Sequence, residues 1–194
     1  KSAQRNCHLL LADLDLDLGD VPGAAEAFKQ ATLDVPETDF SSGAHIVGAE
    51  LALHQNDLDG ARFHAEEGLA VATNADDRLS FSRALMTRAA IRINAGSIDD
   101  VKRGLDDLDD ALRIAEETDY KLLRWHATQL RTKGLRKLAI LDPPNASSHL
   151  LRAQNCDLGS AVALRLSDEQ IAAAREAADA WLGHPPETAD RFRL

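Results

Sequence analysis

The sequence has few of the residues that build β-sheets. Aromatic residues make up 4% of its 194 residues, and the β-branched residues that fill strands are also scarce. Only six prolines and eleven glycines interrupt the chain, and its commonest residues are Ala, Leu, Asp and Arg. A composition with so few strand formers and helix breakers predicts an all-α protein.

Long hydrophobic runs and paired cysteines are also missing. No apolar run approaches the roughly 20 residues that a membrane-spanning helix needs, and the N-terminus lacks the apolar segment of a signal peptide. Cys7 and Cys156 lie far apart and form no C-x-x-C pair, so we expect two buried free thiols. These absences predict a cytoplasmic protein without a membrane partner. The chain begins at Lys1 in helix-like sequence, and we expect it to be part of a longer protein.

Positive charge is scarce in the first part of the chain. Residues 1–118 carry 11 basic and 23 acidic residues, a net charge of −12, whereas residues 119–194 carry 11 and 9, a net charge of +2. Proteins that bind nucleic acids rely on a basic face that displaces counterions from the phosphates. The acidic first part therefore argues against direct binding of DNA or RNA.

Motifs of known enzyme classes are absent. The sequence contains no P-loop, no G-x-S-x-G, no H-E-x-x-H and no Cys/His cluster at metal-ligand spacing. Its seven histidines are scattered. Adjacent acids such as Glu66 and Glu67 diverge by about 100° on a helix, as solvated surface residues do. We predict a protein that is not an enzyme and has no metal or cofactor.

The stretch LLADLDLDLGD, residues 10–20, is compatible with several structures. Its alternation of Asp and Leu is typical of a half-buried strand, and D-x-D-x-D opens a calcium loop. A calcium loop that begins at Asp13 needs Gly at its sixth position and Glu at its twelfth, but Leu18 and Ala24 stand there. The apolar residues instead recur at helical spacing, as one stripe that we expect to be buried: Cys7, Leu10, Leu11, Leu14 and Leu18. Leu9 and Leu16 lie on another flank, which a helix between two neighbours would also bury.

A helix is also predicted after the Gly19-Asp20 turn. Ala24, Phe28 and Ala31 recur at intervals of four and three, and Pro36 lies just beyond the last of them. Together with the helix before the turn, this segment predicts a helix-turn-helix unit. The helical spacing on both sides of the turn makes the strand interpretation less favourable.

The small residues and turns of this unit recur along the chain. The first copy has Ala12, Gly19-Asp20, Ala24, Phe28, Ala31 and Pro36. The second, 37 residues later, has Ala49, Asn56-Asp57, Ala61, Ala65 and Gly68, and the third, 40 residues later again, has Ala89, Gly96-Ser97, Val101, Leu105 and Leu108.

The order and offsets of these residues resemble the tetratricopeptide repeat (TPR), a helix-turn-helix unit of 34 residues. The family's Trp, Gly and Tyr in the first helix are replaced here by His8, Ala12 and Asp15. The resemblance implies an antiparallel helix-pair solenoid, a TPR-like superhelix, with three repeats in residues 1–118. The irregular spacing resembles the degenerate repeats of bacterial LuxR/MalT-type regulators and related signalling ATPases.

The resemblance also implies a binding groove along the first helix of each repeat. A two-carboxylate clamp, as in chaperone adaptors of the family, needs Lys and Asn where this chain has Leu9 and Asp13, so that role is disfavoured. A groove that mixes acids and aliphatic residues suits a partly basic, partly apolar peptide or helix. Its expected residues are Asn6, Leu9, Asp13, Leu16, Asp17, Ile46, Glu50, Leu53, His54, Arg83, Met86, Ala90, Ile93 and Asn94.

The second part, residues 119–194, is expected to continue the same domain. Residues 119–141 predict one long helix that Pro143 and Pro144 end, with an apolar stripe at Leu123, Ala127, Leu130, Gly134, Leu138 and Leu141. This basic helix carries Lys121, Arg124, Arg131, Lys133, Arg136 and Lys137. We expect these bases to pair with the acids of residues 106–110, to form a partner-binding face, or both.

The C-terminal residues predict further helices. We expect one helix with a loop around Gly159 in residues 145–166. Ser167 and Gln170 form a capping box for a final helix that would cover the open end of the array.

Three functions remain open at this stage. The favoured one is a non-catalytic interaction or regulatory module, within a larger bacterial protein, that binds a protein or peptide or another segment of its own chain. The second is a ligand-sensing regulatory domain of a transcriptional regulator or signalling ATPase, which needs an enclosed pocket. The third, a helical enzyme, needs strongly perturbed titratable groups such as a buried acid or a histidine cluster. The oligomeric state stays open.

Overall fold

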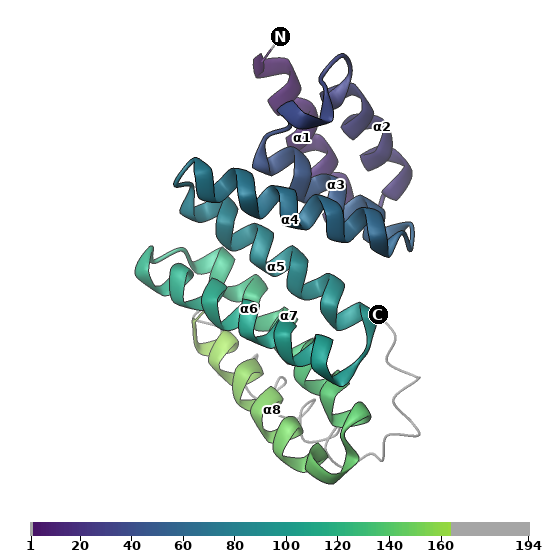
Figure 1. Ribbon diagram of the computed structural model, residues 1–194. Coiled ribbons are helices and arrows are strands. Elements are labelled where there is room, and N and C mark those ends of the chain that lie inside the picture. Colours follow the sequence, from purple (N-terminus) through teal and green to yellow (C-terminus); the bar gives the residue numbers. More distant parts are fainter. Residues whose placement is uncertain (1, 164–194) are drawn as a thin grey trace. The chain divides into compact units, whose positions relative to one another are not determined.

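The computed structural model describes residues 2–163, and all of their regular secondary structure is helical (Figure 1). The α-helices are α1 (Ser2–Asp17), α2 (Val21–Thr32), α3 (Ser42–His54), α4 (Leu58–Asn74), α5 (Arg78–Ala95), α6 (Ile98–Glu117), α7 (Lys121–Leu141) and α8 (Ala146–Ala163). Two single 3-10 turns, η1 (Glu37–Asp39) and η2 (Pro143–Asn145), precede α3 and α8. The prediction of an all-α protein is confirmed for these residues.

Helix α1 decides the question raised by the Asp/Leu alternation. The helix continues through Asp17, and Leu18 still donates its N–H to the carbonyl of Leu14 at 3.0 Å. The predicted helix after the first turn is confirmed as α2, which ends at Thr32, before Pro36. The strand interpretation is therefore wrong, because the residues on either side continue a 3.6-residue period that two-residue alternation alone does not exclude.

Each turn inside the predicted repeats contains one left-handed residue. Gly19 (φ 79°), Asn56 (φ 60°) and Gly96 (φ 87°) adopt left-handed conformations, which Gly and Asn tolerate better than other residues. The residue after each one caps the next helix: the side chains of Asp20, Asp57 and Ser97 accept from backbone N–H groups three residues on. These three predicted turns are confirmed, and they lie 37 and 40 residues apart.

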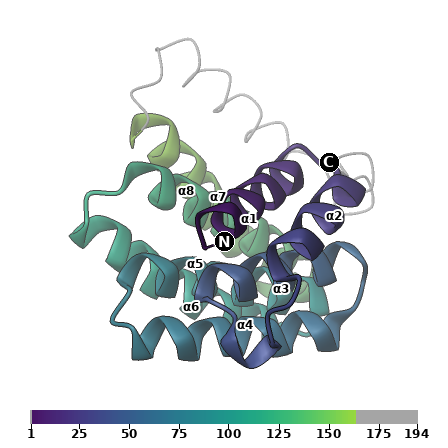
Figure 2. The same ribbon diagram turned by 90° about the horizontal axis from the view of Figure 1, so that it is seen from above.

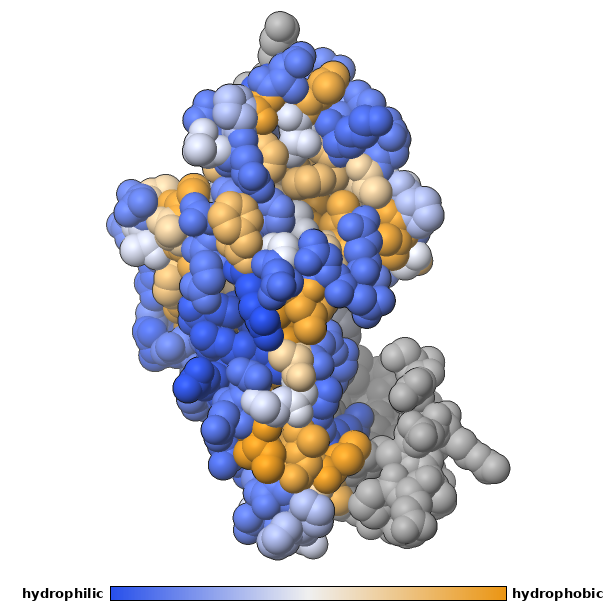
Figure 3. Space-filling model, turned by 45° about the vertical axis from the view of Figure 1, so that its right-hand side comes forward, coloured by the Kyte–Doolittle hydropathy of each residue, from blue (hydrophilic) through white to orange (hydrophobic). Residues whose placement is uncertain are grey.

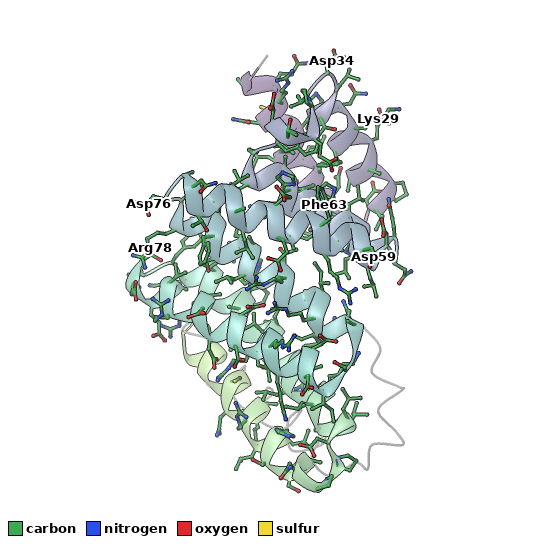
Figure 4. The ribbon with its side chains drawn as sticks, viewed as in Figure 1. Lys29, Asp34, Asp59, Phe63, Asp76 and Arg78 are labelled. Carbon is green, nitrogen blue, oxygen red and sulfur yellow. The ribbon has the colours of Figure 1, made fainter. Side chains whose placement is uncertain are left out.

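Left-handed residues also follow the second helix of each predicted repeat. Asp34 (φ 61°), Asp76 (φ 53°) and Asp119 (φ 50°) stand after α2, α4 and α6, and Figure 4 labels the first two. Asp77 then accepts from the N–H of Ser80 at 3.1 Å at the start of α5. Aspartate is therefore used both for left-handed turns and for capping, at five of the 23 acidic positions of residues 1–118.

Neighbouring helices pack as pairs. In the first unit (residues 1–91), α1 packs against α2, and α3 packs against α4, as seen from the side in Figure 1 and from above in Figure 2. In the second unit (residues 92–194), α6 packs against α7, and α7 packs against α8. The small residues of the repeat pattern are buried: Ala12, Ala24, Ala31, Ala49, Ala61, Ala65 and Ala89. A Cβ added to Gly68 on α4 would lie 3.3 Å from the Cβ of His45 on α3. Residues this small allow the helices to approach closely.

The chain divides into two compact units, Lys1–Ile91 and Arg92–Leu194. The division falls inside α5, whereas the charge of the sequence changes near residue 118. Ile91 is buried with alanines of α3 and α4 in the first unit. In the second unit, a Cβ added to Gly134 on α7 would lie 3.0 Å from side-chain atoms of both Ile93 and Leu105.

The prediction that the apolar stripe of α1 is buried is wrong. We expected Cys7, Leu10, Leu11, Leu14 and Leu18 to be buried, but all five are exposed. Helices α2 and α3 contact the opposite side of α1, where Ala12 and Leu16 join Ala24, Ala27, Val47 and Leu51 in a core cluster. The expectation of two buried thiols therefore holds for Cys156 only.

In the second unit, the long helix predicted up to Leu141 is confirmed as α7, with Leu123, Ala127, Gly134 and Leu138 buried. Helix α8 confirms the helix expected after Pro144, but the loop expected around Gly159 is wrong, since α8 continues to Ala163. The final helix predicted from Ser167 lies outside the described residues. No helix in the described part of the chain has both the length and the apolar character to cross a bilayer.

The turn geometry gives a direct prediction. Asn56→Ala places a Cβ-bearing residue without a locally bonding side chain in a left-handed conformation, and we expect it to lower the free energy of unfolding by about 1 kcal/mol. Asn56→Gly removes the steric cost, so it should change stability by no more than a few tenths. Urea unfolding at 25 °C measures both. Equal effects of the two substitutions would contradict the turn.

Candidate functional site

The first helices of the three predicted repeats are joined by polar side chains. Arg83 on α5 forms an ion pair with Asp13 on α1, with 2.7 Å between Nη2 and Oδ1. One turn further along α5, the hydroxyl of Thr87 donates to Oε1 of Glu50 on α3 at 3.0 Å. Asp13 and Glu50 are 37 residues apart, the spacing of the first two turns. We call Asp13, Glu50, Arg83 and Thr87 the first-helix network.

Glu50 is the acid of this network whose pKa is shifted most. Burial raises the pKa of Glu50 to about 7, and the negative charges of Asp13 and Asp17 act in the same direction. The Arg83 guanidinium and the hydrogen bond from Thr87 oppose the shift but do not cancel it. A carboxyl with this pKa is only partly ionised at neutral pH, so its charge changes in the physiological range.

The remaining groove residues are distributed between the core and the surface. Leu16, Ile46 and Met86 are buried, Leu9, Leu53 and Ala90 are partly buried, and Asn6, Asp17 and His54 are exposed. Ile93 and Asn94 belong to the second unit, where the carbonyl of Asn94 accepts from Nζ of Lys137 at 3.5 Å. In the first unit, the residues left accessible to a partner are therefore Asn6, Leu9, Asp17, Leu53, His54 and Ala90.

The groove carries less negative charge in the structure than the sequence predicted. Asp13 is neutralised by Arg83, and Glu50 holds its proton up to about neutral pH. Of the three acids expected to attract a basic partner, only Asp17 is exposed. The sequence could not indicate this, because the compensating base lies 70 residues from Asp13 along the chain.

A histidine pair that the sequence did not single out lies between α3 and α4. The Nδ1 atoms of His45 and His64 are 3.1 Å apart, so one must donate a hydrogen to the other. The rings of Phe40 and Phe63 lie 5.5 Å and 6.5 Å, centroid to centroid, from that of His45, and Figure 4 labels Phe63 on α4. Nε2 of His64 lies 3.6 Å from Oε1 of Glu37.

The charged form of His45 is disfavoured in this environment. Burial lowers the pKa of His45, and the charge of His64 lowers it further, while Glu67 and Glu37 act in the opposite direction. One sequence signal was available. Helix α3 is rich in small and apolar residues and buries most of its length, so a histidine in it needs a hydrogen-bond partner. Nothing in the pattern indicates that the partner is His64.

The basic helix α7 pairs in part with the acidic residues before it. Nε of Arg131 lies 2.9 Å from Oδ1 of Asp109. This ion pair agrees with the expectation that the bases pair with the acids of residues 106–110. Arg131 also donates to Sγ of Cys156 at 3.4 Å. Lys121 and Lys133 are exposed, and Arg124, Arg136 and Lys137 are partly buried. The pairing of Arg131 is a structural contact, and the expectation of a partner-binding face on α7 stays a prediction.

Comparison with known proteins adds no family assignment. The chain matches no protein-family model, and no curated protein matches it significantly. Within the described residues, no three His, Cys, Asp or Glu side chains are grouped so that they could hold a metal ion. The geometry of the first-helix network and its surroundings is therefore the basis for proposing a function.

The raised pKa of Glu50 predicts a pH effect on stability. Unfolding lowers this pKa from about 7 to about 4.5, so the native state holds the proton more tightly. Glu50 therefore stabilises the protein at acidic pH, and this contribution is lost as pH rises from 4.5 to 7. Relative to wild type, Glu50→Gln should gain up to about 3 kcal/mol between pH 5 and pH 8. Urea unfolding across this range measures the difference, and a parallel profile would contradict it.

The exposed acid Glu26 provides the control for this measurement. Glu26→Gln removes a carboxylate from the surface of α2, so its stability difference from wild type should stay nearly constant over the same range.

The lowered pKa of His45 predicts the opposite dependence. Below pH 6.5 the unfolded chain takes up a proton at this position before the native state does, so the native state loses stability as pH falls. His45→Gln should reduce this loss, whereas His54→Gln, which changes an exposed residue of the same helix, should leave it unchanged. Thermal unfolding at pH 5 and pH 7 compares the variants. Equal acid sensitivity of wild type and His45→Gln would contradict the prediction.

Proposed function

We propose that residues 1–118 form three TPR-like repeats of a non-catalytic interaction or regulatory module that binds a protein or peptide. The observation that carries the proposal is the first-helix network. Arg83 and Thr87 on α5 link this helix to Asp13 on α1 and Glu50 on α3, which stand at matching positions of the first two repeats. Side-by-side alignment of successive first helices is what a helix-pair solenoid requires. The left-handed residues Gly19, Asn56 and Gly96 in the three turns support the same arrangement.

The binding face in this proposal is the exposed part of the first helices. It combines the polar residues Asn6, Asp17 and His54 with the partly buried Leu9 and Leu53. Such a face suits a peptide or helix that presents aliphatic side chains beside a few basic ones. The segment bound could belong to another protein or to the same, longer polypeptide.

The perturbed groups do not require an enzymatic role. Thr87 donates a hydrogen bond to a carboxylate oxygen of Glu50, and His45 and His64 share a hydrogen bond. Each group therefore has a partner inside the protein, as structural networks do. The free thiols of Cys7 and Cys156 support the cytoplasmic location that we propose for the module.

The second candidate is a ligand-sensing regulatory domain of a transcriptional regulator or signalling ATPase. Glu50 favours it, because a carboxyl with a pKa of about 7 beside an arginine changes charge under physiological conditions. In this alternative, a small molecule would stabilise one protonation state of the network.

A display library of random 12-residue peptides tests the interaction role. We expect the immobilised chain to enrich peptides with Lys or Arg beside Leu or Ile. The double variant Asn6→Lys and Asp17→Lys adds three positive charges to the proposed face, and it should bind these peptides at least tenfold more weakly. The matched control, Asp59→Lys and Ala70→Lys, adds three charges to exposed positions of α4 and should bind them normally.

Two results would contradict the proposed face. The first is no enrichment above a blank surface, which would favour the ligand-sensing alternative. The second is equal loss of binding in both double variants, which would indicate a general effect of charge.

A further inference from the structure

Among the described residues, the outer face of α1, continued by Leu18 directly after the helix, carries the largest group of exposed large apolar side chains. Leu10, Leu11, Leu14 and Leu18 are 68%, 47%, 54% and 73% exposed, and Cys7 is exposed beside them. On the face that Figure 3 draws, hydrophobic residues (orange) gather in several places among hydrophilic ones (blue). At 100° per residue, these five side chains fall within about 100° of the helix circumference. They form one continuous stripe, which we call the α1 stripe.

The spacing of the α1 stripe suits packing against another helix. Cys7, Leu11, Leu14 and Leu18 follow one another at intervals of four, three and four residues. These intervals are those of the core positions of a two-stranded coiled coil, in which helices cross at about 20°. The residues are leucines apart from the single cysteine. The stripe therefore has the pattern of an interhelical seam.

The charges along α1 select the orientation of a second copy. Its first half carries Arg5 and His8 and no acid. Its second half carries no base but the acids Asp15 and Asp17, beside Asp13, whose charge Arg83 already pairs. Two parallel copies would place the aspartates side by side. Two antiparallel copies place the basic half of each against the acidic half of the other, and their helix dipoles also oppose.

We propose that the α1 stripe is a self-association surface, on which a second copy of this chain packs its own α1 in antiparallel orientation. A two-fold axis between Leu11 and Leu14 pairs Leu11 with Leu14 of the second copy. It also pairs Cys7 with Leu18 of the second copy. A surface that pairs with itself in this way is what a symmetric dimer needs.

The same register matches the residues that flank the seam. In an antiparallel coiled coil, equivalent flanking positions from the two helices face each other. Here His8 faces Asp15 of the second copy, and the two-fold axis repeats the contact. Both residues are partly exposed in the single chain, so they are accessible for it. The charge match and the apolar seam therefore require the same alignment, although they involve different residues.

The area of the stripe indicates a reversible dimer. At these exposures the four leucines present roughly 400 Å² of apolar surface per copy, comparable to the largest patches on monomers. Two copies would bury about 800 Å² from these leucines, below the size of a stable interface. A dissociation constant on the order of micromolar to tens of micromolar is expected. The inference does not depend on the proposed peptide-binding face.

Sedimentation velocity of the 194-residue chain, from 2 to 200 µM and with reductant, tests the proposal. We expect the mass to double reversibly over this range. Leu11→Glu with Leu14→Glu should weaken association at least tenfold. Both side chains are already exposed, so the fold should tolerate the changes, and circular dichroism checks this. Leu33→Glu, which alters a leucine 55% exposed outside the stripe, should leave the dimer intact.

Cross-linking with diamide tests the orientation. Leu18→Cys should give a covalent dimer through Cys7 of the second copy, because the register brings these positions together. The wild-type chain should not cross-link through Cys7. In the antiparallel pair the two native thiols are separated by about 11 residues, or about 16 Å along the axis, beyond the reach of a disulfide.

Three outcomes would overturn the proposal. A chain that remains monomeric at 200 µM would leave the stripe to another occupant, such as a helix of a different protein. Efficient cross-linking of the wild type through Cys7 would indicate parallel packing. Loss of the dimer in Leu33→Glu as well would place the interface elsewhere.

Discussion

The close packing around α3 is the constraint on which the first unit depends. This helix contacts α1, α2 and α4, and most of its residues are buried. Its small residues make that possible: a Cβ added to Gly48 would lie 3.2 Å from side-chain atoms of both Phe28 and His64. With larger residues the neighbours would be displaced. The histidine pair and the first-helix network both hold their geometry through this helix.

Helix α3 also carries two groups of the first unit whose pKa values are shifted. His45 lies near its start and pairs toward α4, whereas Glu50 lies further along and pairs toward α5. Burial favours the neutral form of each, so the pKa of the base falls and that of the acid rises. The packing that makes α3 a structural centre therefore also makes its two sides respond to pH in opposite directions.

The sequence predicted the helices and turns well because these depend on local chemistry. Left-handed turns at Gly19, Asn56 and Gly96, followed by capping side chains, are visible within four residues of sequence. The side of α1 that packs was not predictable in this way. Periodicity identifies the residues that share a face, but Leu10 and Leu16 both lie on apolar faces, and only the positions of α2 and α3 decide which face is buried.

Three members of the first-helix network were predictable, but Thr87 and the chemistry of the network were not. The resemblance to helix-pair repeats pointed to Asp13, Glu50 and Arg83, which the structure brings into one network. It gave no indication that Arg83 neutralises Asp13 or that Glu50 holds a proton, because both depend on contacts between residues distant in sequence. The continuation of α8 through Gly159 was missed because glycine disfavours a helix by only about 1 kcal/mol, which packing can offset.

A double-mutant cycle between Asp13 and Arg83 tests most directly whether the first helices lie side by side. Urea unfolding of Asp13→Ala, Arg83→Ala and the double variant gives their coupling free energy. We expect about 1 kcal/mol or more, against a few tenths for the exposed pair Asp110 and Arg113 on α6. A coupling within error of zero would show that α1 and α5 are not joined through this pair, and would contradict the first-helix network.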